Sequence, residues 1–486
     1  MSVLGGWVTD AAGLFWLPGV LVLSAAAIAV LVDAFGRTGA AVRLVALASV
    51  LAAGLSAVAA WSTQLRPAVP GVYGGGGLAG CAAVVYLVAA ASLLSSLDGI
   101  GESRRGGVAA LVGLGAVACQ VLAGAVDLVV MAIALETVAV VGYGLVAAGR
   151  GNVSREVGMR YLIQGSVAAG FLVFALAAVV GLGAGQTGYE RLVEVVSGSP
   201  GAAASVTGIL VLVALAFKAG AFPLHSWVPD AYEVVEPGAG VFLAGAPKIA
   251  AVLAVWVLFA RSVWAQESFQ NLRVALAVMA AASIVFGNFA ALKQRDVGRM
   301  LGYSAIAQVG YALVGVVAGA VGTPLLVAAY AIAVAVAFGC VAALQAGRAK
   351  GRSLDDVKGI AMSRPVLAAV MSVAMLSLTG IPLTLGFLGK LWVFYAAVNA
   401  GWTWLALVGA IGSVVSFGYY GKVIQAMYFS EPEQRADEVA APQPADEMEG
   451  RRGRVWPFAL LAALLVVAGT IPLATGFEWV LRVLSV

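Results

Sequence analysis

The sequence predicts an all-α polytopic membrane protein with about 14 transmembrane helices, because apolar stretches of roughly 18 or more residues recur along it. Composition agrees with this fold class. Hydrophobic residues make up 62% of the chain and charged residues 11%, whereas soluble chains are about 45–50% apolar and about 25% charged. A third observation is that three of the apolar stretches contain both a lysine and a proline, which is typical of a polar path inside a membrane.

The expected spans share an apolar run long enough to cross a bilayer. They cover roughly residues 12–34, 41–62, 78–97, 107–125, 128–148, 159–184, 203–224, 239–260, 272–292, 301–320, 322–346, 365–397, 401–427 and 455–483. The twelfth is too long for one plain crossing, which is consistent with a break at Pro382. The count depends mainly on residues 107–148, where only a short polar patch separates two spans.

Two broken, lysine-bearing helices are the central feature. The stretch FKAGAFPLHSW carries Lys218, Pro223 and the only histidine, His225, and GIPLTLGFLGKLW carries Pro382 and Lys390. A lysine at membrane depth costs about 2.5–3.5 kcal/mol unless it faces protein or water. A proline frees a backbone carbonyl, which lipid does not satisfy. These two segments therefore predict a polar path. His225 is either a hydrogen-bonded structural histidine or a proton carrier at the point of entry.

Two further charges lie deep in predicted spans. Glu136 is about 13 Å from Asp127 along a helix that rises roughly 1.5 Å per residue. A role in ion movement is the default for such a residue, and a helix-packing hydrogen bond is the alternative. Lys248 follows Pro247 near the middle of the eighth span. Desolvation disfavours the charged form of a buried lysine, so this group can exchange a proton.

The spans fall into two five-helix units of opposite orientation, spans four to eight and nine to thirteen, with the broken helix fourth in each. This arrangement is typical of inverted-repeat transporters, whose sites lie at discontinuous helices near the midplane. The predicted divisions are a three-helix scaffold (1–104), the first repeat (105–261), the second repeat (262–429), a cytoplasmic linker (430–454) and a last transmembrane helix (455–486).

Charge predicts the topology. With an even number of crossings and both termini outside, the outer loops hold only Arg66, Arg191, Arg261, Arg273 and Arg482. Three lysines lie in the membrane, and the remaining 20 of the 28 basic residues face the cytoplasm. The net charge of +4 thus reflects topology and gives no indication of nucleic-acid binding. The protein is expected in a bacterial or archaeal cytoplasmic (inner) membrane, in contact with the lipid bilayer.

No cofactor or metal site is predicted in this chain. Cys81, Cys119 and Cys340 fall inside predicted spans without a CxxC pattern, so buried free thiols are expected. The glycine-rich stretch VYGGGGLAG is expected to be a flexible loop, because it lacks the Lys-Ser/Thr of a phosphate loop. The N-terminus lacks the basic start and cleavage site of a removable signal peptide, so the first span is expected to be retained.

Four segments together resemble one family. FKAGAFPLHSWVPDAY, FLAGAPKIAA, NFAALKQRDVGRMLGYSAIAQVGY and LSLTGIPLTLGFLGKLWVFY are similar to the antiporter-like, proton-translocating membrane subunits of respiratory complex I. The resemblance covers roughly residues 105–430. The FLAGAPKIAA stretch, the lysine in the twelfth span and the absence of a long lateral helix beyond the last predicted span make it closest to the subunit N (subunit 2) type.

The resemblance implies a role for each buried charge. Glu136 matches the fifth-helix glutamate that modulates the charge state of the seventh-helix lysine, Lys218. Lys248 matches the connecting lysine of the eighth helix, and Lys390 the outlet lysine of the twelfth. No further lysine or histidine lies in a span between Lys248 and Lys390, so water and polar side chains would bridge them. Candidates for lining that water chain are Gln308, Tyr311 and Tyr330.

The function that the resemblance implies is proton translocation from the cytoplasm to the outside, driven by quinone reduction in other subunits. The chain would be a subunit of a proton-translocating NADH:quinone oxidoreductase and carry no redox centre. Quinone, FMN and iron–sulfur clusters would belong to partner subunits, and the partners would be other membrane-arm subunits. One alternative is a subunit of a multisubunit cation/proton antiporter or membrane-bound hydrogenase-type complex. Another is a structural subunit that conducts no protons.

Overall fold

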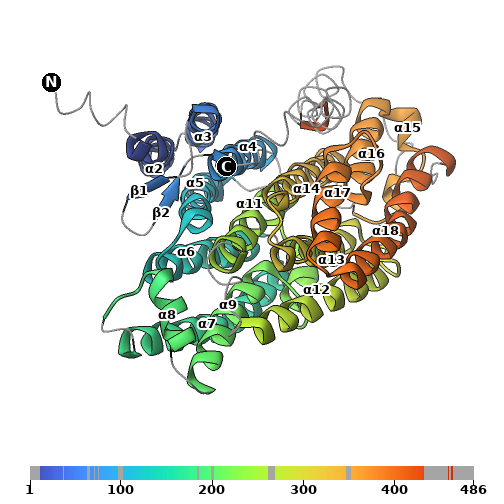
Figure 1. The fold of residues 1–486 in the computed structure, drawn as a ribbon. Coiled ribbons are helices and arrows are strands. Elements are labelled where there is room, and N and C mark those ends of the chain that lie inside the picture. The colour runs from blue at the N-terminus through green and yellow to red at the C-terminus, as the bar shows by residue number, and fades with distance from the viewer. Residues whose placement is uncertain are drawn as a thin grey trace.

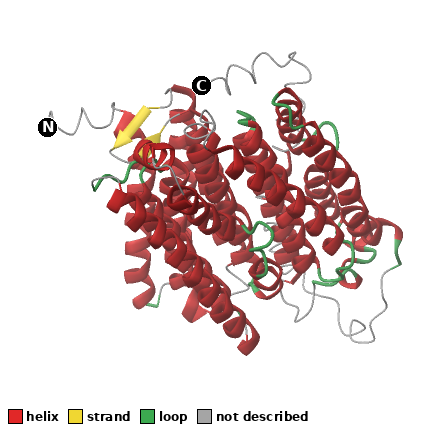
Figure 2. Cartoon of the chain, turned by 60° about the horizontal axis from the view of Figure 1, so that its bottom comes forward, coloured by secondary structure: helices red, strands yellow, loops and turns green. Residues whose placement is uncertain are grey.

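The protein is a bundle of long helices, shown from two directions in Figures 1 and 2. The computed structural model describes residues 11–36, 38–62, 66–69, 72–74, 76–96, 102–149, 151–182, 185–198, 202–260, 269–345, 352–431, 458 and 461–463. Most of the predicted linker and almost all of the last predicted span lie outside the described residues. Of that span, Phe458 is described and packs at Gly339.

Eleven helices among the described residues are long and apolar enough to cross a membrane. Helices suit lipid because they satisfy their backbone polar groups internally. They are α2 (Ala11–Ala34), α3 (Thr38–Ser62), α4 (Gly76–Ser96), α5 (Glu102–Gly124), α6 (Leu128–Ala147), α7 (Gly151–Leu182), α11 (Pro237–Val255, continued by η1, Trp256–Ala260), α12 (Gln270–Ala291), α13 (Val297–Ala318), α14 (Thr323–Gln345) and α18 (Thr403–Phe429). Each matches one predicted span.

The seventh and twelfth predicted spans are each divided into two helices. The seventh span forms α9 (Ala202–Ala219) and α10 (Trp227–Val234). The twelfth span forms α16 (Pro365–Thr379) and α17 (Leu385–Asn399). The apolar parts of α9, α16 and α17 are shorter than a full crossing. The predicted fold class, an all-α polytopic membrane protein with two broken helices, is confirmed.

The two five-helix units repeat the same packing. In the first unit α6 and α11 pack on α5, and in the second α13 and α18 pack on α12. The helix before each break, α7 or α14, packs on both halves of the broken helix that follows, and the fifth helix, α11 or α18, packs on the first half. Because each unit has five crossings, the second begins on the opposite side of the membrane. These contacts are those of an inverted repeat.

Helix α11 lies at the centre of the bundle (Figure 1). All of its residues from Pro237 to Val255 are buried. It packs on α4, α5 and α9 on one side and on α13 and α14 on the other. A helix that is apolar all round belongs in such a position. It therefore links the N-terminal helices and both repeats, and it carries Lys248 into the interior.

Small residues allow α12 and α13 to cross closely. A Cβ added at Gly310 would lie 2.8 Å from the Ala280 carbonyl oxygen and 2.9 Å from the Ile284 backbone nitrogen, so a side chain there meets backbone. We expect Gly310→Ala to destabilise the protein by about 1–3 kcal/mol, the usual cost of overpacking. Gly170→Ala is the matched control, because a Cβ at Gly170 meets nothing within 4 Å. Equal thermal denaturation of the two variants in detergent would contradict this assignment.

The structure corrects the prediction for VYGGGGLAG. Val72–Gly74 forms strand β2, which pairs antiparallel with β1 (Arg66–Val69), and α4 begins already at Gly76. A backbone bridge from Val72 to Ala125 ties the strand to the end of α5. Strand pairing satisfies the backbone groups of this segment and orders it. The remaining short elements are α8 (Tyr189–Gly198), η3 (Asp355–Val357) and α15 (Ile360–Ser363).

Candidate functional site

The first break begins after Ala219, and Lys218 lies in the last turn of α9. Gly220 has φ +78°, a left-handed conformation that ends the helix and favours glycine. Helix α10 then begins at Trp227. The carbonyl oxygen of Ala219, the last residue of α9, accepts a hydrogen bond from Lys248 Nζ at 2.6 Å. A side chain on Gly220 would collide with that ammonium group. The break thus exposes a carbonyl to a buried lysine.

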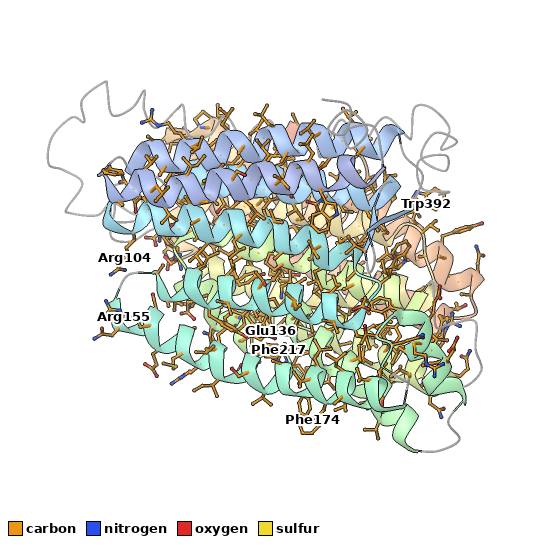
Figure 3. All side chains as sticks on the ribbon, turned by 90° about the vertical axis from the view of Figure 1, so that its left-hand side faces the viewer. Arg104, Glu136, Arg155, Phe174, Phe217 and Trp392 are labelled. Carbon is orange, nitrogen blue, oxygen red and sulfur yellow. The ribbon has the colours of Figure 1, made fainter. Side chains whose placement is uncertain are left out.

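Lys218 is buried, at 1% exposure, between three helices. Its Nζ donates a hydrogen bond to Tyr161 Oη of α7 at 3.4 Å and lies 5.7 Å from the centre of that ring. Glu136 of α6 attracts it electrostatically. Figure 3 places Glu136 and Phe217 about midway along the bundle, with Arg104 and Arg155 at one end. The predicted pair Glu136 and Lys218 is therefore brought together at mid-depth.

Lys248 is equally buried, on the central helix α11. Besides the bond to Ala219, its ammonium group lies 4.4 Å from the centre of the Trp227 ring. A cation above an aromatic face is attracted by about 0.5–2 kcal/mol. Both contacts come from the first broken helix. The charge on Lys248 is thus compensated by a carbonyl dipole and a ring, with no carboxylate in hydrogen-bond contact among the described residues.

The second break has the same construction. Helix α16 ends at Thr379, and Gly380 follows with φ +86°. Lys390 of α17, at 4% exposure, donates hydrogen bonds to the carbonyl oxygens of Leu378 at 3.0 Å and Thr379 at 2.8 Å. Its Nζ also lies 4.4 Å from the centre of the Tyr311 ring. A lysine, a helix-end carbonyl and an aromatic ring recur together.

Lys248 and Lys390 occupy equivalent positions at the two helix breaks. Each binds the last carbonyl of the first half of a broken helix, next to a left-handed glycine. Comparison of the sequences pairs Lys390 with Lys218, since these are the lysines of the two broken helices. The structure shows a counterpart for Lys248 that the sequence comparison lacks. The reason is that Lys248 reaches its break from a neighbouring helix, whereas Lys390 reaches its break from the same span.

Two of the predicted water-chain residues lie at Lys390. Gln308 Nε2 donates to the Leu378 carbonyl at 2.7 Å, so Gln308 and Lys390 share one acceptor. Tyr311 lies under the lysine. Its hydroxyl accepts a hydrogen bond from Asn288 Nδ2 at 3.0 Å. A cluster of buried polar groups therefore surrounds the ammonium group of Lys390.

The third predicted residue, Tyr330, lies between the two repeats. Its buried hydroxyl lies beside those of Tyr232 of α10 and Tyr420 of α18. The Tyr420 hydroxyl is in turn next to the side chains of Ser304 and Gln308. A cluster of buried polar groups of this kind can hold bound water. Polar groups thus continue from the first broken helix to the polar cluster around Lys390.

His225 lies away from the lysines' hydrogen bonds. Its ring stacks on Phe222, with centroids 5.2 Å apart, and contacts Phe286 at 4.4 Å. Its buried Nδ1 is beside the backbone of Pro223. The next residue, Ser226, donates to Gln164 Oε1 at 3.2 Å. The structure therefore places His225 in the break itself, half-buried, and leaves its role as a proton carrier as a hypothesis.

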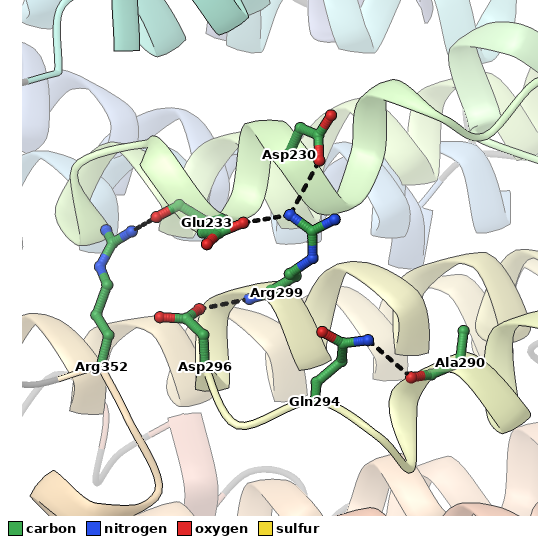
Figure 4. A network of polar contacts seen from close by, with 7 residues as sticks. All are labelled: Asp230, Glu233, Ala290, Gln294, Asp296, Arg299 and Arg352. Carbon is green, nitrogen blue, oxygen red and sulfur yellow. Dashed lines mark hydrogen bonds and ion pairs between the residues drawn. The ribbon is translucent and has the colours of Figure 1, made fainter. Parts of the chain in front are cut away.

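A charged network holds the C-terminal half of α10 (Figure 4). Arg299 of α13 forms ion pairs with Asp230, at 3.0 Å, and with Glu233. Arg352 donates to the backbone carbonyl oxygens of Glu233 and Val235. Both arginines belong to the second repeat, and the carboxylate and carbonyl groups that they bind belong to the first. The network therefore joins the two repeats.

Asp296 completes this network. Its Oδ1 accepts a hydrogen bond from the backbone N–H of Arg299 at 2.7 Å and so caps α13. Burial raises the pKa of the Asp296 carboxyl above its usual value, while the Arg299 hydrogen bond and the charge of Arg352 oppose that rise. Burial likewise lowers the pKa of Arg352, against the attraction of Asp296. Mutual attraction thus offsets part of the cost of burying the two charges, and burial remains the larger effect.

Several site residues were not predicted as such. Tyr161 contacts Lys218, Trp227 contacts Lys248, and the two rings stack. Tyr419 donates to Asn288 Oδ1 at 3.0 Å. A tyrosine in an apolar span gives little signal, because packing explains it equally well. Trp227 is in the FKAGAFPLHSW motif, yet its position beneath Lys248 depends on how α10 folds back. The three cysteines are buried free thiols.

The comparisons with known proteins agree with this arrangement. Residues 125–416 match the family model described as NADH:quinone oxidoreductase/Mrp antiporter, transmembrane. NADH-quinone oxidoreductase subunit N 1 of Acidiphilium cryptum is 37% identical over 330 residues, which are 66% of this chain and 68% of the relative. Subunit N of Rhodospirillum rubrum is 35% identical over 354 residues, 70% of this chain and 69% of the relative.

Solved structures show the same fold. A chain of respiratory complex I from Thermus thermophilus superposes with a TM-score of 0.71 at 26% identity, covering 93% of this chain and 97% of the other. A chain of the Mrp complex from Dietzia sp. gives 0.82 at 20% identity, with 98% and 96% covered. The second likeness shows the fold alone. The protein therefore belongs to the NADH:quinone oxidoreductase/Mrp antiporter transmembrane family and, within it, to the subunit N type of respiratory complex I.

Proposed function

We propose that this chain translocates protons from the cytoplasm to the outside, using Lys218, Lys248 and Lys390 as successive proton-holding groups. The observation that carries the proposal is the seating of Lys248 and Lys390 on the carbonyl ends of two broken helices, each under 5% exposed. Burial disfavours the charged form of an ionisable group that has no adjacent counter-ion, so such a lysine can give up its proton to a neighbouring acceptor.

The proposed route has three stages. Protons enter near His225 and reach Lys218, then pass to Lys248. Water held by the hydroxyl and amide groups of Tyr330, Gln308 and Tyr311 carries them across to Lys390, from which they leave outside. Attraction to Glu136 favours the protonated form of Lys218. Any rearrangement that separates the two charges therefore favours proton release toward Lys248.

The driving force in this proposal is quinone reduction in other subunits of a proton-translocating NADH:quinone oxidoreductase in a bacterial inner membrane. Quinone, FMN and iron–sulfur clusters would be held by those partner subunits. Residues 105–261 and 262–429 act as the two conducting repeats, and residues 1–104 act as a scaffold. The positive-inside distribution of charge supports an outside position for both termini.

Glu136→Gln tests the proposed route. We expect a lower proton-to-electron ratio in the assembled complex with quinone reduction retained, because the amide no longer attracts the charge of Lys218. The measurement is dye-reported acidification of vesicles alongside the quinone reductase rate. Glu156→Gln is the matched control, since Glu156 is an exposed carboxylate paired with Arg160 on α7. A wild-type proton-to-electron ratio in Glu136→Gln would exclude the proposed role of Glu136.

A further inference from the structure

The end of helix α16 surrounds a positive charge with neutral groups. Lys390 Nζ lies 3.0 Å from the carbonyl oxygen of Leu378 and 2.8 Å from that of Thr379. The ring of Tyr311 lies on another side of the ammonium group, with its centre 4.4 Å away. No charged group among the described residues acts electrostatically on Lys390. Two carbonyl dipoles and an aromatic face therefore compensate this buried charge.

Groups of the same kind bind free monovalent cations in membrane proteins. Carbonyl oxygens replace the hydration shell of K⁺ in channel filters, and the C-terminal ends of half-helices coordinate Na⁺ in transporters with broken helices. The C-terminus of a helix also carries about half a negative charge. Helix α16 has 15 residues and ends at Thr379, where Gly380 turns the chain away. The ammonium group of Lys390 therefore occupies a position that suits a free cation.

A third oxygen lies beside the two carbonyls. The hydroxyl of Ser377 is buried and makes no hydrogen bond in the part of the chain that the structure describes. The residue is 2% exposed and packs against Gly386 of α17, where an added Cβ would lie 3.0 Å from Ser377 Oγ. Gly386 precedes Lys390 by one turn, on the same face of α17. An oxygen with free lone pairs is thus available next to the ammonium group.

We propose that the carbonyl end of α16 is a binding site for a monovalent alkali cation, Na⁺ or K⁺, which the tethered ammonium group of Lys390 fills and so closes to free cations. The tether favours the lysine, because a group delivered by a helix loses little further freedom on binding, whereas a free ion loses its translation. Lys390 is then the residue that determines ion specificity at the second break. This consequence for transport rests on the proposed function, and the cation site does not.

The first break contains a smaller set of ligands. Lys248 Nζ contacts one helix-end carbonyl, that of Ala219, and the ring of Trp227. A Cβ added at Gly220 would lie 2.6 Å from that nitrogen, so little space surrounds it. The second break offers two carbonyl oxygens and a hydroxyl, and it is the place to test the inference.

The test measures equilibrium binding of radioactive Na⁺ and Rb⁺, the latter in place of K⁺, to the purified assembled complex at constant ionic strength. Lys390→Ala removes the ammonium group and leaves the carbonyl oxygens free, so we expect one more saturable site per complex than in wild type. Lys390→Met fills the space with an uncharged chain of similar length and should add no site. Lys390→Ser also frees the carbonyl oxygens and serves if Lys390→Ala does not assemble.

Two further variants locate the added site. Ser377→Ala combined with Lys390→Ala should weaken the added binding several-fold, because one oxygen ligand is lost. Lys422→Ala is the matched control, since Lys422 also binds a helix-end carbonyl, that of Leu292, but is exposed. It should add no site.

The result that supports the inference is tighter added binding of one ion than of the other, which also identifies the cation as Na⁺ or K⁺. The inference is refuted if Lys390→Ala and Lys390→Ser bind no more Na⁺ or Rb⁺ than wild type, or if Lys390→Met gains the same site. The proposed function fails on a different result, normal pumping by Lys218→Ala alone.

Discussion

Lys218→Ala in the assembled complex is expected to reduce both proton pumping and quinone reduction to below about a tenth of wild type, since a positioned proton-transfer group contributes about 10²-fold or more. The lysine is fully enclosed, with Tyr161 Oη at 3.4 Å and Glu136 as its electrostatic partner. Its loss leaves Glu136 without that partner and interrupts the route at its first buried group. The two rates are measured on the same vesicles, with native gel electrophoresis to confirm assembly.

Lys358→Ala is the control for this prediction. Lys358 pairs with Asp355 at 2.6 Å near the surface, outside the route, and its loss should change neither rate. A joint fall of pumping and quinone reduction in Lys218→Ala alone would assign the lysine to a relay coupled to redox chemistry. If neither rate changes, the subunit is scaffold and the buried charges need another explanation.

Lys390→Arg should give an assembled complex that pumps at less than about a tenth of the wild-type rate, because the guanidinium keeps the charge yet does not release a proton. Arginine also supplies donors for the carbonyl oxygens of Leu378 and Thr379, which accept two hydrogen bonds from the native lysine. Lys390→Met removes these bonds and should additionally destabilise the protein, by about 1.5–3 kcal/mol for each bond to a charged group.

The chain offers a matched control for the arginine variant. Lys422 of α18 also donates to a helix-end carbonyl, that of Leu292 at 2.8 Å, but it is exposed. Lys422→Arg should therefore pump normally. Wild-type pumping by Lys390→Arg would show that Lys390 acts only as a fixed positive charge that holds the second break together. Thermal denaturation of all three variants separates loss of stability from loss of proton exchange.

The sequence predicts the helices well because their cause is local. Apolar runs of bilayer length fix each span, and Pro223 and Pro382 mark the two breaks. The buried charges are also visible, since a charge in an apolar run stands out. Their partners are not visible. Lys248 meets Ala219 across 29 positions of sequence, and only tertiary packing brings the two together.

The aromatic residues show the same limit more clearly. Tyr161 and Trp227 come from α7 and α10, and nothing in their local sequence distinguishes them from other buried rings. The same holds for Tyr420, which reaches Tyr330 only because the second repeat folds back on the first. Polar groups shared between repeats depend on how two distant units pack, which no periodicity within a single span encodes.

The network around Arg299 has a mechanical consequence. It holds α10 at Glu233, whereas Trp227 lies at the opposite end of this 8-residue helix. Six residues separate the two, or about 9 Å at roughly 1.5 Å per residue. Arg299 also pairs with Asp230, only three residues from Trp227, and the indole of Trp227 donates to the carbonyl oxygen of Phe217. The short helix is therefore held along its length, so a displacement of Arg299 with the second repeat would be transmitted to the indole ring beside Lys248.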